Sequence, residues 1–138
     1  MNGRRWFLFT SVGFLAGCRK KRASGYPGYA FVSNHEGRAV AAIDLNIFAV
    51  TKHIAMDAAP GPILSHPGRE AVYVLAPDAG MLVEVETTSL AVRRKAHAGA
   101  QAVDMRFSGD GRHLWILCKQ PRQLMRVLLD TLQPDGTI

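Results

Sequence analysis

Short apolar segments recur along the chain at a fixed spacing. They read Ala30-Phe31-Val32-Ser33, Val72-Tyr73-Val74-Leu75 and Leu114-Trp115-Ile116-Leu117, beginning at residues 30, 72 and 114, a period of 42 residues with an aromatic residue always second. Apolar and polar positions alternate in residues 81–86 and 103–107. A period of two is the pattern of β-strands, whose successive side chains point to opposite faces. The chain after residue 29 is therefore predicted to be an array of short strands.

Turn signals separate these segments. Residues 64–69 and 107–112 share Ser, Gly and Arg in the same order, with Pro or Asp before the glycine. Glycine supplies a positive φ, and Pro or Asp suits the earlier turn positions, so each hexad predicts a reversal between two strands. Residues 91–102 are rich in Ala, Arg and Lys, which leaves a helix as the alternative there. Gly99 and the alternation that follows favour strands.

Four short strands in about 42 residues is the size of one propeller blade. The order of a Ser-Gly-Arg turn, an apolar-aromatic-apolar strand and an acid-ended strand resembles the YVTN-type β-propeller repeat family over residues 29–132. The family's Tyr-Val-Thr-Asn stands here as Phe31-Val32-Ser33-Asn34, Tyr73-Val74-Leu75-Ala76 and Trp115-Ile116-Leu117-Cys118. The resemblance implies an inner strand at 61–65, then strands at 71–76, 81–87 and 90–96, with the next blade starting at 101.

The expected fold class is therefore all-β, a partial β-propeller of about two and a half four-stranded antiparallel blades. Residues 29–55 are expected to supply the last three strands of an opening blade. Closed propellers use roughly four to eight blades. Either the reading frame is cut short, or several copies assemble into a ring, and we favour the first because nothing after Gln133 resembles a segment that protects a sheet edge.

The first 18 residues have the parts of a signal peptide. A basic start at Arg4 and Arg5 precedes an apolar stretch from Trp6 to Ala16, which is shorter than the roughly 20 residues of a membrane-spanning helix. The stretch ends in Leu15-Ala16-Gly17-Cys18, which looks like a bacterial lipoprotein box. Small residues let a peptidase approach the backbone, and the Cys18 thiol accepts the lipid. We expect residues 1–18 to be the signal peptide ending in this cysteine, 19–28 a basic, Gly/Pro-containing tether and 29–138 the incomplete propeller.

The leader also bears on the export route. Arg4-Arg5-Trp6-Phe7-Leu8 resembles the twin-arginine signal, which carries proteins that are already folded. Gly3 and Phe9 depart from that pattern, so the general secretion route stays open, and the charges of residues 19–22 tend to stay on the cytoplasmic side. The predicted location is the cell envelope, facing the periplasm or exterior, with the membrane as partner through the lipid on Cys18.

Charge argues against a nucleic-acid partner. The net charge is +6, but six of the 17 basic residues lie in the first 22 positions, where there is no acid. The remaining 11 basic residues are matched by 11 acidic ones. A neutral body lacks the dense basic surface that phosphate binding requires.

Site chemistry is sparse. The five histidines show no metal-ligand spacing and are interpreted as surface-loop residues, Cys118 is interpreted as a small buried hydrophobe, and no catalytic motif, metal or cofactor is expected besides the covalent lipid. Propeller ligands meet the loops at one face of the ring. The candidate residues for such a face are His35, Asp78, His97, Lys119 and Arg122.

Three functions remain open. The favoured one is a binding or scaffold lipoprotein that displays a propeller face to an envelope protein or a small ligand. The alternative is an enzyme, because relatives of this repeat family occur among lactonases and quinone-dependent dehydrogenases, with active residues in missing blades. The third is a fragment without function. Fold alone does not decide among them.

Overall fold

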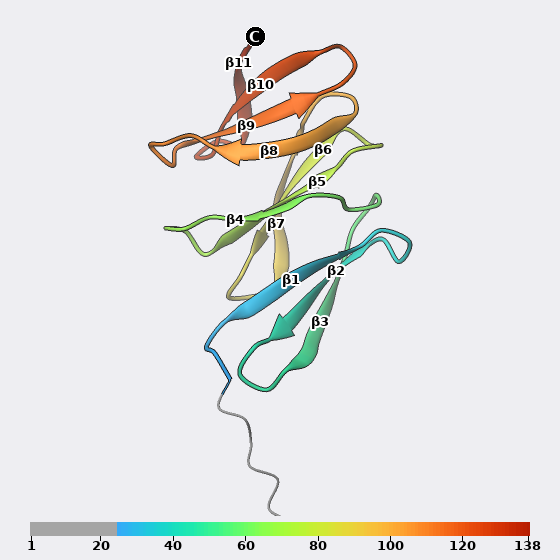
Figure 1. The fold of residues 1–138 in the computed structure, drawn as a ribbon, viewed down its shortest axis with the longest axis vertical. Coiled ribbons are helices and arrows are strands. Elements are labelled where there is room, and N and C mark those ends of the chain that lie inside the picture. Colours follow the sequence, from blue (N-terminus) through green and yellow to red (C-terminus); the bar gives the residue numbers. More distant parts are fainter. Residues whose placement is uncertain (1–24) are drawn as a thin grey trace, which may run out of the picture.

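The structure, a computed structural model, describes residues 25–138. This part of the chain folds into eleven strands in three antiparallel sheets that are stacked along the long axis of the molecule (Figure 1). Blade 1 contains β1 (Tyr29–Asn34), β2 (Ala39–Asp44) and β3 (Ala49–Ala55). Within residues 25–138, no helix has the length and apolar character needed to cross a bilayer.

Blades 2 and 3 each have four strands. Blade 2 contains β4 (Ile63–Ser65), β5 (Ala71–Ala76), β6 (Met81–Glu86) and β7 (Ala91–His97). Blade 3 contains β8 (Ala102–Phe107), β9 (His113–Cys118), β10 (Gln123–Leu128) and β11 (Gln133–Thr137). Consecutive strands pair as neighbours in every sheet, so each blade is a simple antiparallel meander.

The all-β partial propeller predicted from the sequence is confirmed, including the three-stranded opening blade. Strand 71–76 has the predicted bounds, and the other three predicted strands of blade 2 agree to within two residues. The helical alternative for residues 91–102 is wrong, because these residues form β7 and the connection into β8.

The predicted turns form through their own side chains. In the second hexad, the backbone N–H of Arg112 donates to Asp110 Oδ1 at 2.9 Å, and that of His113 donates to Ser108 Oγ at 3.1 Å. Gly111 adopts a φ of 65°, which glycine reaches without a steric penalty. These two side-chain acceptors therefore stabilise the turn that joins β8 to β9.

The 42-residue period also appears in the backbone dihedral angles. Phe48, Leu90 and Leu132 end the turns that join the last two strands of the three blades, and all three have a positive φ of 52° to 56°. A β-bulge lies six residues before each, between residues 42/43, 84/85 and 126/127. Positive φ is rare for large side chains. Each blade therefore repeats the same strained turn.

Two apolar clusters hold the blades together. One lies between blades 1 and 2 and the other between blades 2 and 3. The aromatic side chain at the second place of the first two repeats faces the following blade: Phe31 packs on the first cluster and Tyr73 belongs to the second. Cys118 is buried in that second cluster, as predicted.

Glu84 is buried although it is an acid in an alternating strand. The strand is confirmed, but the carboxylate is only 2% exposed and is the one buried charged side chain of residues 25–138. Both faces of β6 are covered by neighbouring blades, so alternation here separates two interfaces and not a core from solvent.

Candidate functional site

The meander topology sorts the turns onto two faces of the stack. We call the face with turns 35–38, 77–80 and 119–122 the hairpin face, and the face with loops 66–70 and 108–112 and turns 45–48, 87–90 and 129–132 the loop face. The last strand of a blade ends at the hairpin face: the N–H of Met56 donates to the Arg38 carbonyl at 2.8 Å, and that of Ala98 donates to the Gly80 carbonyl at 2.7 Å.

All five predicted ligand-face residues lie on the hairpin face. His35, Asp78, Lys119 and Arg122 occupy its three turns, His97 ends β7 beside Gly80, and all five are exposed. Asp78 lines a cleft of about 250 Å³ together with Arg38, Asp57 and three alanines. The structure thus places these residues at one edge of the stack without joining them into one site, and their role in binding stays a prediction.

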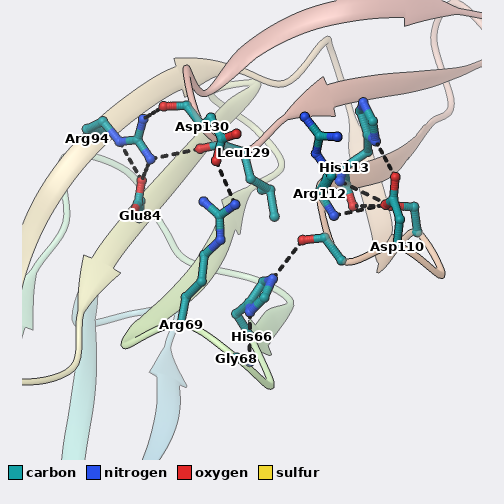
Figure 2. A network of polar contacts seen from close by, with 12 residues as sticks. His66, Gly68, Arg69, Glu84, Arg94, Asp110, Arg112, His113, Leu129 and Asp130 are labelled. Atoms are coloured by element: carbon teal, nitrogen blue, oxygen red, sulfur yellow. Dashed lines mark hydrogen bonds and ion pairs between the residues drawn. The ribbon is translucent and has the colours of Figure 1, made fainter.

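A larger cleft, of about 480 Å³, opens on the loop face between blades 2 and 3 (Figure 2). Its walls are mostly charged: Arg69, Glu70, Glu84, Glu86, Arg93, Arg94 and Asp130, with Ala71. Sequence inspection missed this site. The hexad arginine and the acids of residues 81–86 were visible, but nothing local shows that they meet.

Glu84 and Arg94 form the centre of the cleft. Arg94 Nε donates to Glu84 Oε2 at 2.6 Å. The same guanidinium crosses to blade 3, where Nη1 donates to the Asp130 carbonyl at 2.7 Å and Nη2 to the Leu129 carbonyl at 2.9 Å. A buried carboxylate requires a charged, hydrogen-bonded partner. Arg94 supplies it and at the same time closes the end of β10 onto blade 2.

Two further contacts cross the same boundary. Arg69 Nη2 donates to Asp130 Oδ1 at 2.6 Å, which lowers the pKa of Asp130. His66 Nδ1 accepts the N–H of Gly68 at 3.0 Å, so its Nε2 carries the proton that it donates to the Gly111 carbonyl at 2.9 Å. His66 is therefore a half-buried connector between blades (Figure 2), not the surface-loop residue that we expected.

Tyr73 lies beneath this network. Its side chain is fully buried, its ring meets Phe107 edge to face at 5.7 Å, and its hydroxyl has no hydrogen-bond partner among the described residues. Burial, followed by the nearby charge of Glu84, raises the pKa of Tyr73. The hydroxyl therefore stays protonated at neutral pH.

The chemistry available in the cleft is ion pairing. Arg94 is committed to three acceptors, and Arg69 is committed to Asp130. Arg93 is more open, at 59% exposed and 3.7 Å from Glu84. The cleft therefore acts first as a joint between blades. Residues 25–138 hold no group of three or more His, Cys, Asp or Glu side chains that could bind a metal ion.

Cys118 does not line this cleft and takes no part in its ion pairs. Its thiol donates to the Ala98 carbonyl at 3.3 Å, and burial raises its pKa. A thiol with a raised pKa is a poor nucleophile at neutral pH. The export and anchoring residues, Cys18, Leu15, Ala16, Gly17, Arg4, Arg5, Phe7 and Leu8, lie outside the described part of the chain.

Comparison with known proteins gives the fold. The chain is similar to hydrazine synthase from Kuenenia stuttgartiensis, with a TM-score of 0.74 and 17% identity over 91% of this chain and 39% of that one. The described residues form part of a β-propeller. A dihydro-heme d1 dehydrogenase, NirN, matches with a TM-score of 0.71 and 15% identity over 85% of this chain and 28% of the other.

The WD40 domain of coronin from Toxoplasma gondii matches with a TM-score of 0.68 and 12% identity over 84% of this chain and 32% of that one. No family model matches the chain. No curated protein matches it closely enough to count as a relative. This chain spans less than two fifths of each of the three solved chains, and identities this low show the fold alone.

Proposed function

We propose that this chain is an exported, lipid-anchored β-propeller protein that binds a ligand or an envelope protein through its hairpin face. The observation that carries the proposal is the contrast between the two faces. On the loop face, Arg69 and Arg94 are committed to holding blades together. On the hairpin face, His35 and Asp78 are exposed on turns that backbone hydrogen bonds hold in place, and His97 is exposed at the end of β7.

Hydrogen-bonded turns with exposed polar side chains are the usual place for recognition on a propeller, because such turns lose little conformational entropy when a partner binds. The leader supports the location. An apolar stretch followed by Leu15-Ala16-Gly17-Cys18 favours lipid attachment at the cysteine, and Arg4 and Arg5 favour the twin-arginine route. The repeat itself we assign to the YVTN type, on the segments beginning at residues 30, 72 and 114.

Anchoring is tested at Cys18. Two or more acyl chains hold a protein stably on a bilayer, whereas one alone binds only marginally. Cys18→Ala is expected to abolish incorporation of labelled fatty acid and to move the exported chain from the membrane fraction to the soluble one. Ser24→Ala is the matched control and leaves both unchanged. A Cys18→Ala chain that still carries label or still sediments with membranes contradicts the anchor.

Binding is tested with the full lipidated chain in detergent, used to capture partners from envelope extract. Asp78→Lys on the hairpin face is expected to lose at least tenfold of whatever the unaltered chain captures specifically. Thr88→Lys, a change at an exposed residue of the loop face, is expected to retain it. Turnover of a lactone or a quinone without specific capture would favour the enzyme alternative.

A further inference from the structure

The cleft between blades 2 and 3 has more negative than positive charge. Four carboxylates and three guanidinium groups line it, and both blades that form it belong to the described part of the chain. Two ion pairs, Arg69 with Asp130 and Arg94 with Glu84, account for four of these seven groups. Two carboxylates and one guanidinium remain. The joint between the blades therefore uses only part of the chemistry of the cleft.

The two remaining carboxylates belong to Glu70 and Glu86. Glu70 is exposed and Glu86 is half-buried, and neither makes an ion pair within residues 25–138. Glu86 Oε2 accepts the hydroxyl of Ser89 at 2.7 Å. Glu70 precedes Ala71, which is the direct cross-strand partner of Glu86. These two acids therefore give the cleft a local excess of negative charge.

Glu84 supplies an acceptor at the bottom of the cleft. The residue is 2% exposed, and its Oε2 accepts Arg94 Nε at 2.6 Å (Figure 2). Its other oxygen, Oε1, accepts no hydrogen bond within residues 25–138, and Arg93 Nη1 lies 3.7 Å away from it. That distance is too long for a hydrogen bond. A buried carboxylate oxygen is best stabilised by a charged donor, so Oε1 is suited to a cationic one.

Tyr73 provides a polar atom beside this carboxylate. Tyr73 and Glu84 are direct partners across β5 and β6, and the tyrosine hydroxyl is buried with no hydrogen-bond partner among the described residues. After burial, the pKa of Tyr73 responds to the charges of Glu84 and three arginines, all of which line the cleft. The hydroxyl is therefore directed at the cleft. A buried polar group without a partner is destabilising, and its presence here indicates a use.

We propose that this cleft binds the primary ammonium group of a small organic cation. The ammonium donates to Glu84 Oε1, with the Tyr73 hydroxyl as a second acceptor, and displaces the loosely held guanidinium of Arg93. An ammonium is a compact charge with three donors, so it approaches Oε1 more closely than the guanidinium does. Glu70 and Glu86 attract the cation. The volume of about 480 Å³ is typical of small-molecule sites. This site is separate from the hairpin face and does not rest on the proposed function.

The test measures binding of 1,4-diaminobutane to the full chain in non-ionic detergent, by isothermal titration calorimetry at low salt. The unaltered chain is expected to bind the diamine saturably and not to bind butanoate, an anion with the same number of carbon atoms. Glu86→Gln keeps an oxygen for the Ser89 hydroxyl but removes the charge, and should weaken diamine binding about fivefold. Glu36→Gln, the same change at an exposed residue of the hairpin face, is the control and leaves the affinity unchanged.

Arg93 shows which sign of charge the cleft recognises. Arg93→Gln removes the competing cation and should strengthen diamine binding about threefold, whereas a site for an anion would lose affinity. Tyr73→Phe should weaken binding about threefold without lowering Tm, since the hydroxyl has no partner to lose. The proposal is overturned if the unaltered chain does not bind the diamine, if Glu86→Gln or Tyr73→Phe binds it unchanged, or if Arg93→Gln weakens binding. Circular dichroism shows that each variant is folded.

Discussion

The two blade interfaces of this molecule use the same repeat positions in different ways. Between blades 1 and 2 the cluster is aliphatic, with seven buried residues, and its polar contacts lie at the rim, such as Lys95 with Asp57. Between blades 2 and 3 the cluster has fourteen buried residues and adjoins the pair of Glu84 and Arg94. Blade 1 lacks an inner strand, which accounts for part of the difference in size.

The charged joint arises from two substitutions within the repeat. Glu84 occupies the position of Ala42 in blade 1, and Arg94 occupies that of Lys52. Ala42 is fully buried and needs no partner, so Lys52 extends to the rim, 3.5 Å from the Ser89 carbonyl. The interface of blades 1 and 2 thus has its polar contacts at the rim, while the interface of blades 2 and 3 adds hydrogen bonds to a buried carboxylate.

The largest expected difference between the two interfaces is in the stability lost when Arg94 or its equivalent Lys52 is replaced. Arg94→Met leaves the carboxylate of Glu84 buried with only the exposed Arg93, 3.7 Å away, as a counter-ion, and should lower the free energy of unfolding by roughly 3–5 kcal/mol. Lys52→Met, at the equivalent position of blade 1, should change it by less than about 0.5 kcal/mol. Urea unfolding measures both values. Equal effects would show that the charged joint contributes no more than a surface pair.

Apolar packing gives the next comparison. Leu75→Ala removes a fully buried side chain from the interface of blades 2 and 3 and should cost roughly 2–5 kcal/mol, including the cavity that it leaves. Leu117→Ala, at the same repeat position on the exposed face of blade 3, should cost less than about 0.5 kcal/mol. Similar costs for the two substitutions would contradict this difference in burial.

The smallest expected effect is on the pH dependence of stability. Arg69 lowers the folded pKa of Asp130, so the pair stabilises the fold above the unfolded pKa of about 3.9 and this contribution is lost as pH falls through the folded pKa. Asp130→Asn should therefore lower Tm at pH 7 and show a shallower fall in Tm below pH 4. A slope identical to that of the unaltered chain would contradict the pairing.

Some of that slope should remain in Asp130→Asn. The pKa of Asp110 is lowered to about 2, chiefly by the hydroxyl of Ser108, and Arg126 lowers that of Asp135. Both carboxylates belong to blade 3 alone. Asp110→Asn should therefore affect the pH dependence in the same direction.

Local patterns in the sequence were sufficient to predict most of the strands, two of the turns and the 42-residue period. Apolar segments with an aromatic second residue place β5 and β9, and alternation places β6 and β8. The two Ser-Gly-Arg hexads predict the reversals into β5 and β9, because these features depend on neighbours along the chain. The sequence predicted the candidate site only in part. Topology puts Asp78 and His97 at one edge, as expected, but their exposure follows from the packing around them.

Only the tertiary structure shows where the charged side chains lie and which repeat positions are exposed. Glu84 is an acid, and only the packing of blade 3 against blade 2 shows that its side chain is buried. Arg94 then connects Glu84 of blade 2 to the Asp130 carbonyl of blade 3. Phe48 and Leu132 have the same place in the repeat, yet one is exposed and the other buried. Burial of a repeat position is decided by the blade beside it, and no local pattern contains that neighbour.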